Sequence, residues 1–188
     1  MFIFIIPLLV GFILNSASTF TSTFSRRWGK RKGQWASVIL RDVFGIPLWV
    51  IGLAMAVREP AQGLISTGPV TEILVWSLMI TGCGVMICGL GMLGKRAAAP
   101  TMEDKLEERG IYAFIRHPIY TGLIIEFCGI ILLKPTWPVM IACGLGLIWI
   151  PLQARLEEKD LVERLPGYRD YMQRVPRFFP HISHLHKE

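Results

Sequence analysis

The sequence predicts an all-α integral membrane protein with five transmembrane helices, and composition and charge distribution support this prediction. Of the 188 residues, 52% are hydrophobic and only 18% are charged, whereas a soluble domain has about 25% charged residues. The mean hydropathy is +0.46. The charges are gathered between long apolar runs instead of being spread along the chain. A chain of this length is expected to form one domain, residues 1–188.

Five apolar segments approach the length of about 20 residues that a helix needs to cross a bilayer. In order, they are Met1–Phe24, Ala36–Val57, Val70–Leu93, Pro118–Leu133 and Trp137–Leu152. Residues 134–136 alone separate the last two, which predicts a tight hairpin of antiparallel helices. For the first segment a cleaved signal peptide is the alternative, because the small residues 16–18 resemble a cleavage site, although no basic residue precedes them.

The distribution of basic residues predicts the topology. Seventeen of the 20 Lys and Arg follow the first, third and fifth segments, two follow the second and fourth, and Arg41 lies within the second. By the positive-inside rule, the N-terminus lies outside and the C-terminal tail is cytoplasmic. The net charge of +6 is therefore assigned to cytoplasmic loops and not to nucleic-acid binding, because no basic stretch matches a nucleic-acid module. The compact chain is typical of a bacterial or archaeal inner membrane.

The first stretch whose residues could bind a ligand or take part in catalysis precedes the fourth apolar segment. It reads Gly110-x-Tyr112-x-x-x-Arg116-His117-Pro118-x-Tyr120-x-Gly122. Proline suits the first turn of a helix, so the fourth helix is expected to begin at Pro118. Its free backbone N–H groups and positive dipole end would lie beside Arg116 and His117, where a carboxylate would bind well. The alternative is an interfacial anchor with a helix cap.

The second such stretch follows the fifth segment. It reads Glu157-Glu158-x-x-Leu161 and then Pro166-Gly167-Tyr168-x-x-Tyr171. The fifth helix is expected to continue out of the membrane to about Leu165 and to be broken by Pro166-Gly167. Adjacent residues of a helix point about 100° apart, so at most one of Glu157 and Glu158 faces a given pocket. The alternative is a solvated amphipathic helix with salt bridges.

The two stretches, in this order and separated by a helical hairpin, resemble the isoprenylcysteine carboxyl methyltransferase family and are similar to the related phospholipid N-methyltransferases. The resemblance covers about residues 106–180 and implies a cofactor-binding part at about residues 95–180. It implies that S-adenosylmethionine is held between the C-terminal helices and the cytoplasmic tail, and that a lipid-soluble substrate enters from the membrane. The cofactor-binding positions that match are Tyr112, Arg116, His117, Pro118, Tyr120, Glu157, Glu158, Tyr168 and Tyr171.

The chemistry of these residues agrees with the resemblance. Arg116 and the helix start can hold the carboxylate of the cofactor, and a glutamate can accept from its ribose hydroxyls. Tyrosine faces suit an adenine ring and a sulfonium cation. The candidate catalytic residues are Arg116, His117 and Glu126, the last because a carboxylate within a membrane helix is by default a functional hypothesis. His117 or Glu126 would be the base for an acceptor that must lose a proton.

The predicted function is therefore methyl transfer from S-adenosylmethionine to a lipophilic or small acceptor at the cytoplasmic membrane face. The acceptor is left open among a prenylcysteine-like carboxylate, a thiol and a lipid amine. The alternatives are an NADPH-dependent membrane sterol-type reductase and a non-catalytic transport or assembly subunit. No metal is expected: the four cysteines lie in apolar runs without ligand spacing, and His181, His184 and His186 are interpreted as a solvated tail.

Overall fold

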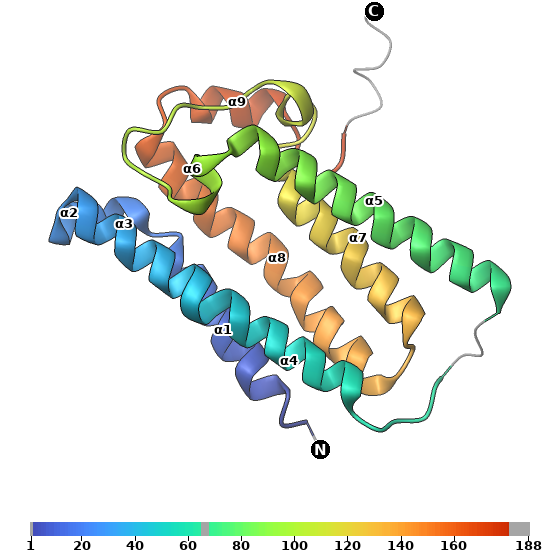
Figure 1. Ribbon diagram of the computed structural model, residues 1–188. Coiled ribbons are helices and arrows are strands. Elements are labelled where there is room, and N and C mark those ends of the chain that lie inside the picture. The colour runs from blue at the N-terminus through green and yellow to red at the C-terminus, as the bar shows by residue number, and fades with distance from the viewer. Residues whose placement is uncertain (1, 65–67, 181–188) are drawn as a thin grey trace, which may run out of the picture.

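The computed structural model describes residues 2–64 and 68–180, and within these ranges the chain is helical and contains no strand (Figure 1). The helices are α1 (Ile5–Ser18), α2 (Thr21–Trp28), α3 (Lys30–Val38), the π-helical turn η1 (Ile39–Gly45), α4 (Ile46–Arg58), α5 (Pro69–Leu93), α6 (Lys95–Ala98), the 3₁₀ turn η2 (Gly110–Ala113), α7 (Pro118–Leu133), α8 (Trp137–Arg164) and α9 (Tyr168–Arg174). The predicted all-α class is confirmed. The histidines at 181, 184 and 186, interpreted as a solvated tail, lie outside the described residues.

The described helices identify a membrane protein with three candidate spans, or four if a bent pair counts as one. The three are Lys30–Arg58, Pro69–Leu93 and Trp137–Arg164, and the bent pair is α1 with α2. Helix α7 is apolar but has only 16 residues. The expected count of five crossings and the orientation of the termini therefore stay predictions.

The first apolar segment, expected as one helix, is broken at residues 19–20, near its C-terminal end. Helices α1 and α2 meet at an angle of 63°. Two hydroxyl side chains at the break bind backbone carbonyls: Ser18 Oγ donates to Asn15 O at 2.5 Å and Thr19 Oγ1 donates to Ser16 O at 2.7 Å. Such local bonds offer the backbone an alternative to the helical ladder, which accounts for the bend in this Ser- and Thr-rich stretch.

Two helix pairs form the walls of the bundle, and α8 joins them. In Figure 1, α1 lies along α4 on one side, α5 lies along α7 on the other, and α8 runs between the pairs. The backbones of α5 and α7 approach so closely that a Cβ atom at Gly122 would lie 2.5 Å from Gly82 O. The apolar core lies where the pairs meet α8, and there Phe12 and Trp149 stack with ring centroids 4.4 Å apart.

The boundaries of the C-terminal helices agree with the sequence prediction. Helix α7 begins at Pro118, the hairpin turn is residues 134–136, and α8 continues past its apolar part to Arg164. Gly167 has φ = 83°, a left-handed conformation that favours glycine, and it turns the chain into α9. The chain therefore returns over the charged end of α8, beside the start of α7.

Candidate functional site

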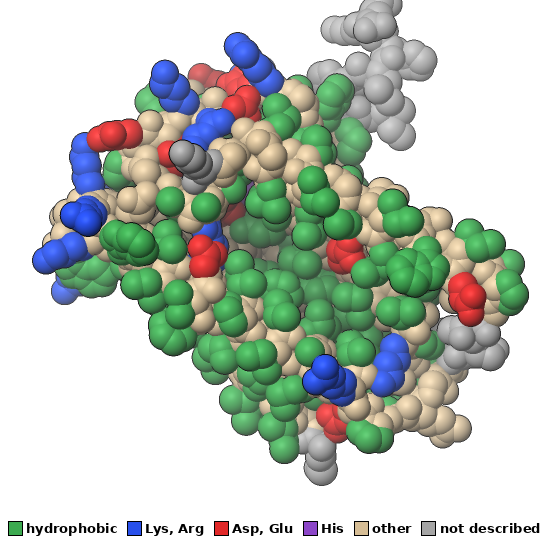
Figure 2. Space-filling model, viewed as in Figure 1, with side chains coloured by type: hydrophobic (Ala, Val, Ile, Leu, Met, Phe, Trp, Pro, Cys, Tyr) green, Lys and Arg blue, Asp and Glu red, His purple; other side chains and the backbone are tan. Residues whose placement is uncertain are grey.

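A cavity of about 720 Å³ lies at the end of the bundle where α5 ends and α7 begins. A volume of this size is typical of small-molecule sites. The space-filling view in Figure 2 shows a hollow with hydrophobic walls between α4 and α5. Its lining includes polar residues, among them Arg116, Glu157 and Asp104, and apolar residues, among them Trp49 and Leu123. Such a lining suits ligands, or parts of a ligand, of different polarity.

The backbone before α7 is fixed by the chain that follows α9. Arg116 N donates to Pro176 O at 2.9 Å and His117 N donates to Arg177 O at 3.0 Å. His117 is the N-cap residue of α7, and its carbonyl accepts the bond from Thr121 N at 2.9 Å. These bonds hold the Arg-His pair at the cavity wall and occupy both of its backbone N–H groups.

Glu158 is the centre of a buried charge cluster. Arg177 binds its carboxylate in bidentate fashion, from Nε at 3.0 Å and from Nη2 at 2.7 Å. His117 Nε2 lies 3.1 Å from Glu158 Oε1, and Arg116 Nη2 lies 3.3 Å from the same oxygen. The hydrogen bond to Glu158 raises the pKa of Arg177 above its ordinary value, so this guanidinium is charged. One carboxylate thus faces two guanidiniums, those of Arg116 and Arg177.

Arg116 has hydrogen-bonding capacity that the protein does not use. Its side chain is 7% exposed, and its Nε and Nη1 atoms have no partner among the described residues. A buried donor without a partner is destabilising by roughly 1–3 kcal/mol, and more for a charged group. Because Arg116 also lines the cavity, these two donors are suited to a carboxylate of a bound molecule.

The two adjacent glutamates face different surroundings, as the helical geometry predicts. Glu157 lines the cavity and accepts a hydrogen bond from Tyr120 at 2.7 Å, whereas Glu158 does not line it. The Tyr120 ring in turn stacks on His117, with centroids 5.4 Å apart and planes 22° apart. Tyr120 therefore links Glu157 to the charge cluster of Glu158 and His117.

Three tyrosines contribute a second wall. Tyr171 donates to Tyr112 O at 2.6 Å, Tyr112 donates to Gly89 O at 3.3 Å, and the rings of Tyr168 and Tyr171 lie 5.6 Å apart. Burial raises the pKa of all three phenols above the ordinary tyrosine value, so they are neutral donors at physiological pH. The hydroxyl of Tyr168 has no partner among the described residues.

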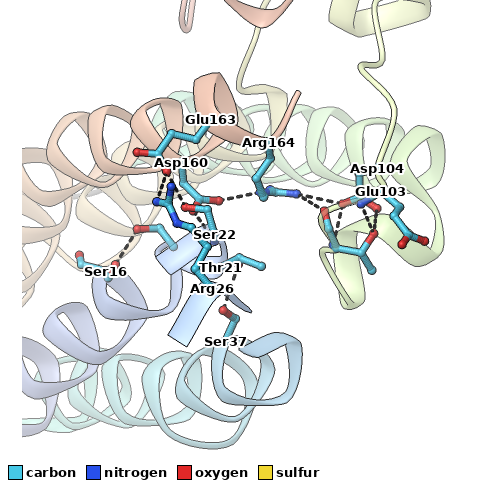
Figure 3. A network of polar contacts seen from close by, with 12 residues as sticks. Ser16, Thr21, Ser22, Arg26, Ser37, Glu103, Asp104, Asp160, Glu163 and Arg164 are labelled. Atoms are coloured by element: carbon cyan, nitrogen blue, oxygen red, sulfur yellow. Dashed lines mark hydrogen bonds and ion pairs between the residues drawn. The ribbon is translucent and has the colours of Figure 1, made fainter. Parts of the chain in front are cut away.

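A non-helical segment, residues 99–109, covers the cavity and is called the covering segment. Figure 3 shows the side chain of Arg164 between Asp160, to which it donates at 2.6 Å, and Asp104, to which it donates at 3.2 Å. Arg164 also donates to Thr101 O at 2.7 Å, and these bonds attach the covering segment to α8. Asp160 also accepts from the backbone N of Ser22 at 2.7 Å, near the start of α2. The covering segment, α2 and α8 therefore meet in one polar network.

The covering segment has a second attachment on the side of α6. Arg96 donates to Lys105 O at 2.9 Å and to Glu107 at 2.7 Å. The hydrogen bond from Arg96 holds the pKa of Glu107 below its ordinary value. Both ends of the covering segment are thus held by arginines, which keeps it over the cavity.

The structure brings most of the predicted site residues to this cavity. Those that line it are Tyr112, Arg116, His117, Pro118, Tyr120, Glu157, Tyr168 and Tyr171. Glu158 reaches it only through its partners. Glu126 does not line it and lies instead between α7 and α5, where a Cβ atom at Gly82 would be 3.0 Å from its Oε1 atom. The roles of these residues in binding and catalysis stay predictions.

Sequence reasoning missed three arginines, Arg96, Arg164 and Arg177, and the tryptophan Trp49. The spacing of Asp160 and Arg164, four residues apart on a helix, is a signal that could have indicated their pairing. Nothing local to Arg177 indicates that it reaches Glu158. In the part of the chain that the structure describes, no group of three or more His, Cys, Asp or Glu side chains could hold a metal.

Comparison with known proteins supports the resemblance in the C-terminal half. The family model described as phospholipid methyltransferase matches residues 70–167 of the chain. No solved structure gives a significant match.

Three curated relatives match about half of the chain. Methanethiol S-methyltransferase 1 of Bradyrhizobium diazoefficiens is 35% identical over 95 residues, covering 47% of this chain and 30% of that protein. The cobalt-zinc-cadmium resistance protein CzcN of Cupriavidus metallidurans is 26% identical over 101 residues, covering 53% and 44%. The nickel-cobalt-cadmium resistance protein NccN of Alcaligenes xylosoxydans xylosoxydans is 29% identical over 110 residues, covering 56% and 47%. The chain therefore spans less than half the length of each of these relatives.

Proposed function

Because this chain belongs to the phospholipid methyltransferase family, we propose that it transfers a methyl group from S-adenosylmethionine to a lipophilic or small acceptor. The observation that carries the proposal is the buried guanidinium of Arg116, which lines the cavity with two unpartnered donors. A group with this geometry and charge binds a carboxylate, and the cofactor carries one.

The remaining parts of the cavity fit the rest of this cofactor. Glu157 offers a carboxylate for ribose hydroxyls, and its bond from Tyr120 fixes its position. The rings of Tyr168 and Tyr171 offer aromatic faces for adenine or for a sulfonium cation. When bound, the cofactor supplies a methyl group on a positively charged sulfur.

The residues of the chain contribute alignment and the exclusion of water. Methyl transfer is an in-line displacement, so its rate depends on holding donor and acceptor atoms in contact and in register. Arg116, Glu157 and the tyrosines fix one end, and the covering segment closes the cavity against water. For an acceptor that must lose a proton, His117 is the better positioned of the two candidate bases, because it lines the cavity and Glu126 does not.

The acceptor is proposed to enter through the hollow between α4 and α5 that Figure 2 shows, from within the membrane. The walls there include Ile46, Met86 and Leu123, which suit a lipophilic molecule. The similarity to a methanethiol S-methyltransferase supports a thiol as one class of acceptor. Because the basic residues gather at the same end as Arg116, we propose that the cofactor enters from the cytoplasm.

Calorimetric titration of the detergent-purified chain with S-adenosylhomocysteine, the demethylated cofactor, tests the proposal. We expect saturable binding that Arg116→Met abolishes or weakens by at least about tenfold, as the loss of a charge-assisted hydrogen bond predicts. NADPH is the control ligand and is expected not to compete. Absence of binding at millimolar ligand, or tighter binding of NADPH, would overturn the proposed function.

A further inference from the structure

A cluster of basic residues surrounds the turn between α2 and α3. Five of the seven residues at positions 26–32 are Lys or Arg, and all five are exposed. No Asp or Glu occurs in the first 41 residues, so no acidic neighbour in the sequence balances them. Figure 2 shows Lys and Arg side chains gathered over this end of the molecule, with hydrophobic side chains beside them. This group is called the basic cluster, and its members are Arg26, Arg27, Lys30, Arg31 and Lys32.

The protein itself uses only part of this positive charge. Arg26 pairs with Glu163 of α8 at 2.5 Å, and Lys30 pairs with Glu103 of the covering segment at 2.7 Å. These two pairs hold the cluster against the rest of the molecule. The other three members have no hydrogen-bond or ion-pair partner among the described residues; they are Arg27, Arg31 and Lys32. Three neighbouring positive charges therefore lack a counter-charge from the protein, which favours the binding of an anion.

The length of the helix places the basic cluster at the level of lipid headgroups. Lys30–Arg58 is one candidate span of 29 residues, and at 1.5 Å per residue it is about 43 Å long. The hydrocarbon core of a bilayer is about 30 Å thick, which corresponds to about 20 helical residues. Because Arg58 is charged, it marks one boundary of that core, and the other boundary then lies near Val38. Residues 30–37 therefore extend into the headgroup region.

One exposed face of this helix changes from charged to aromatic to aliphatic. Arg31, Trp35, Ile39 and Val43 follow one another at intervals of four residues, and residues four apart share a helix face. Trp35, Ile39 and Val43 are 57%, 41% and 56% exposed. Exposed aliphatic side chains within a membrane span face lipid chains, so this face is directed at the bilayer. Trp35 lies at the interface, where tryptophan is enriched, and Arg31 lies one turn beyond it.

Helix α2 adds a second exposed tryptophan beside the basic cluster. Gly29 has φ = 87°, a left-handed conformation that favours glycine, and it turns the chain from α2 into α3. Trp28, directly before the turn, is 49% exposed and stacks on Phe24 with ring centroids 5.3 Å apart. An indole has an apolar ring and a polar N–H group, which suits the boundary between lipid chains and water. The basic cluster is therefore accompanied by two residues suited to this boundary.

We propose that the basic cluster binds the headgroups of anionic phospholipids, with Trp28 and Trp35 as interfacial anchors. The charges are complementary, and each Lys or Arg near an anionic membrane surface increases the affinity about fivefold. A zwitterionic headgroup carries its own cation and gains much less from these residues. None of the five basic residues lines the cavity. This lipid site is thus separate from the candidate methyl-transfer site, and its test does not depend on the proposed function.

Competition between two lipids on the full chain tests the preference for negative charge. The detergent-purified protein is incubated with equal amounts of dioleoylphosphatidylglycerol, which is anionic, and dioleoylphosphatidylcholine, which is zwitterionic. Native mass spectrometry then counts the lipids that remain bound. We expect phosphatidylglycerol to be retained at least about tenfold more than phosphatidylcholine. Equal retention of the two lipids, or displacement of phosphatidylglycerol by millimolar inorganic phosphate or by an RNA oligonucleotide, overturns the inference.

A triple variant tests whether the basic cluster is the site of this preference. The variant replaces the three unpartnered members: Arg27→Gln, Arg31→Gln and Lys32→Gln. We expect its retention of the two lipids to become equal within about twofold. The matched control removes three other exposed basic residues without a partner among the described residues: Arg155→Gln, Lys159→Gln and Arg169→Gln. Both variants lose the same net charge, so an equal loss of preference in both would assign the effect to general surface charge and overturn the inference.

A photoreactive lipid locates the site without any substitution. Phosphatidylglycerol with a photoreactive group on its headgroup is expected to cross-link the unaltered chain within residues 24–35, as mapped by mass spectrometry of its peptides. Cross-links found solely outside this range overturn the inference, and this experiment decides if the triple variant does not fold. Trp35→Ala should lower the retention of both lipids, whereas unchanged retention would refute its role as an anchor.

Discussion

Replacing Arg177 with glutamine removes the bidentate partner of the buried Glu158. Two hydrogen bonds of 3.0 and 2.7 Å are lost, and the carboxylate keeps only His117 and Arg116 as partners. A hydrogen bond to a charged group contributes roughly 1.5–3 kcal/mol. Since the Arg177 side chain is 28% exposed, water replaces part of the interaction. We expect the free energy of unfolding to fall by roughly 2–3 kcal/mol, which lowers the unfolding temperature by roughly 5–10 °C.

The same substitution should also weaken the cofactor site. Without Arg177, Arg116 is the one guanidinium that Glu158 contacts, so it is drawn closer to Glu158 and is less available to a ligand carboxylate. We expect the affinity for S-adenosylhomocysteine to fall about tenfold, or about 1.4 kcal/mol. The two assays are thermal unfolding in detergent and calorimetric titration with that ligand.

Arg174→Gln is the matched control for this experiment. Arg174 pairs with Glu108 at 3.1 Å, but that pair is exposed, so its loss should change stability by less than about 1 kcal/mol. The double variant Arg177→Gln with Glu158→Gln should not recover the lost stability, because it also leaves the buried guanidinium of Arg116 without its carboxylate partner. If Arg177→Gln changes unfolding and ligand affinity no more than Arg174→Gln does, the charge cluster does not support the site and the reasoning is refuted.

Three further substitutions test other contacts of the site. Gly89→Ala should destabilise the chain by about 1–3 kcal/mol, because a Cβ atom there would lie 2.9 Å from the proline that begins α7; Gly84→Ala, where a Cβ meets nothing within 4 Å, is its control, and equal unfolding temperatures would contradict the close packing. Tyr120→Phe removes the 2.7 Å bond to Glu157 and should weaken S-adenosylhomocysteine about 5- to 10-fold in calorimetry, while unchanged affinity would separate Glu157 from the ligand. Arg164→Gln breaks buried ion pairs that are worth roughly 3–5 kcal/mol when one partner is removed, and it should speed protease cleavage within residues 99–109; an unchanged cleavage rate would show that other contacts hold this segment.

The sequence predicts those features of the fold that local chemistry determines. Pro118 begins α7 because proline suits the first helical turn, and Gly167 turns the chain after α8 because the left-handed conformation favours glycine. The different directions of Glu157 and Glu158 follow from helical geometry alone. Most predicted site residues meet at one cavity for the same reason, since two ordered motifs on one side of a helical hairpin are brought together by the hairpin.

Features that depend on distant contacts could not be predicted. The bend after α1 depends on which hydroxyls bind backbone carbonyls, and a Ser- and Thr-rich stretch permits either choice. The pairing of Arg177 with Glu158 needs the turn of the chain after α9, and the position of Trp49 at the cavity needs the packing of α4 against α8. A further case is the position of Glu126 between α5 and α7, which needs the packing of these two helices, while its functional role stays a prediction.

The bond from Ser22 N to Asp160 has a consequence for how the protein is made. The first turn of α2 obtains its hydrogen-bond acceptor from a residue 138 positions later in the chain. During synthesis the N-terminal helices therefore leave the ribosome and enter the membrane long before that acceptor exists. A chain that ends before α8 lacks both this hydrogen bond and a wall of the cavity. Premature termination would thus yield a fragment whose N-terminal helices lack this hydrogen bond.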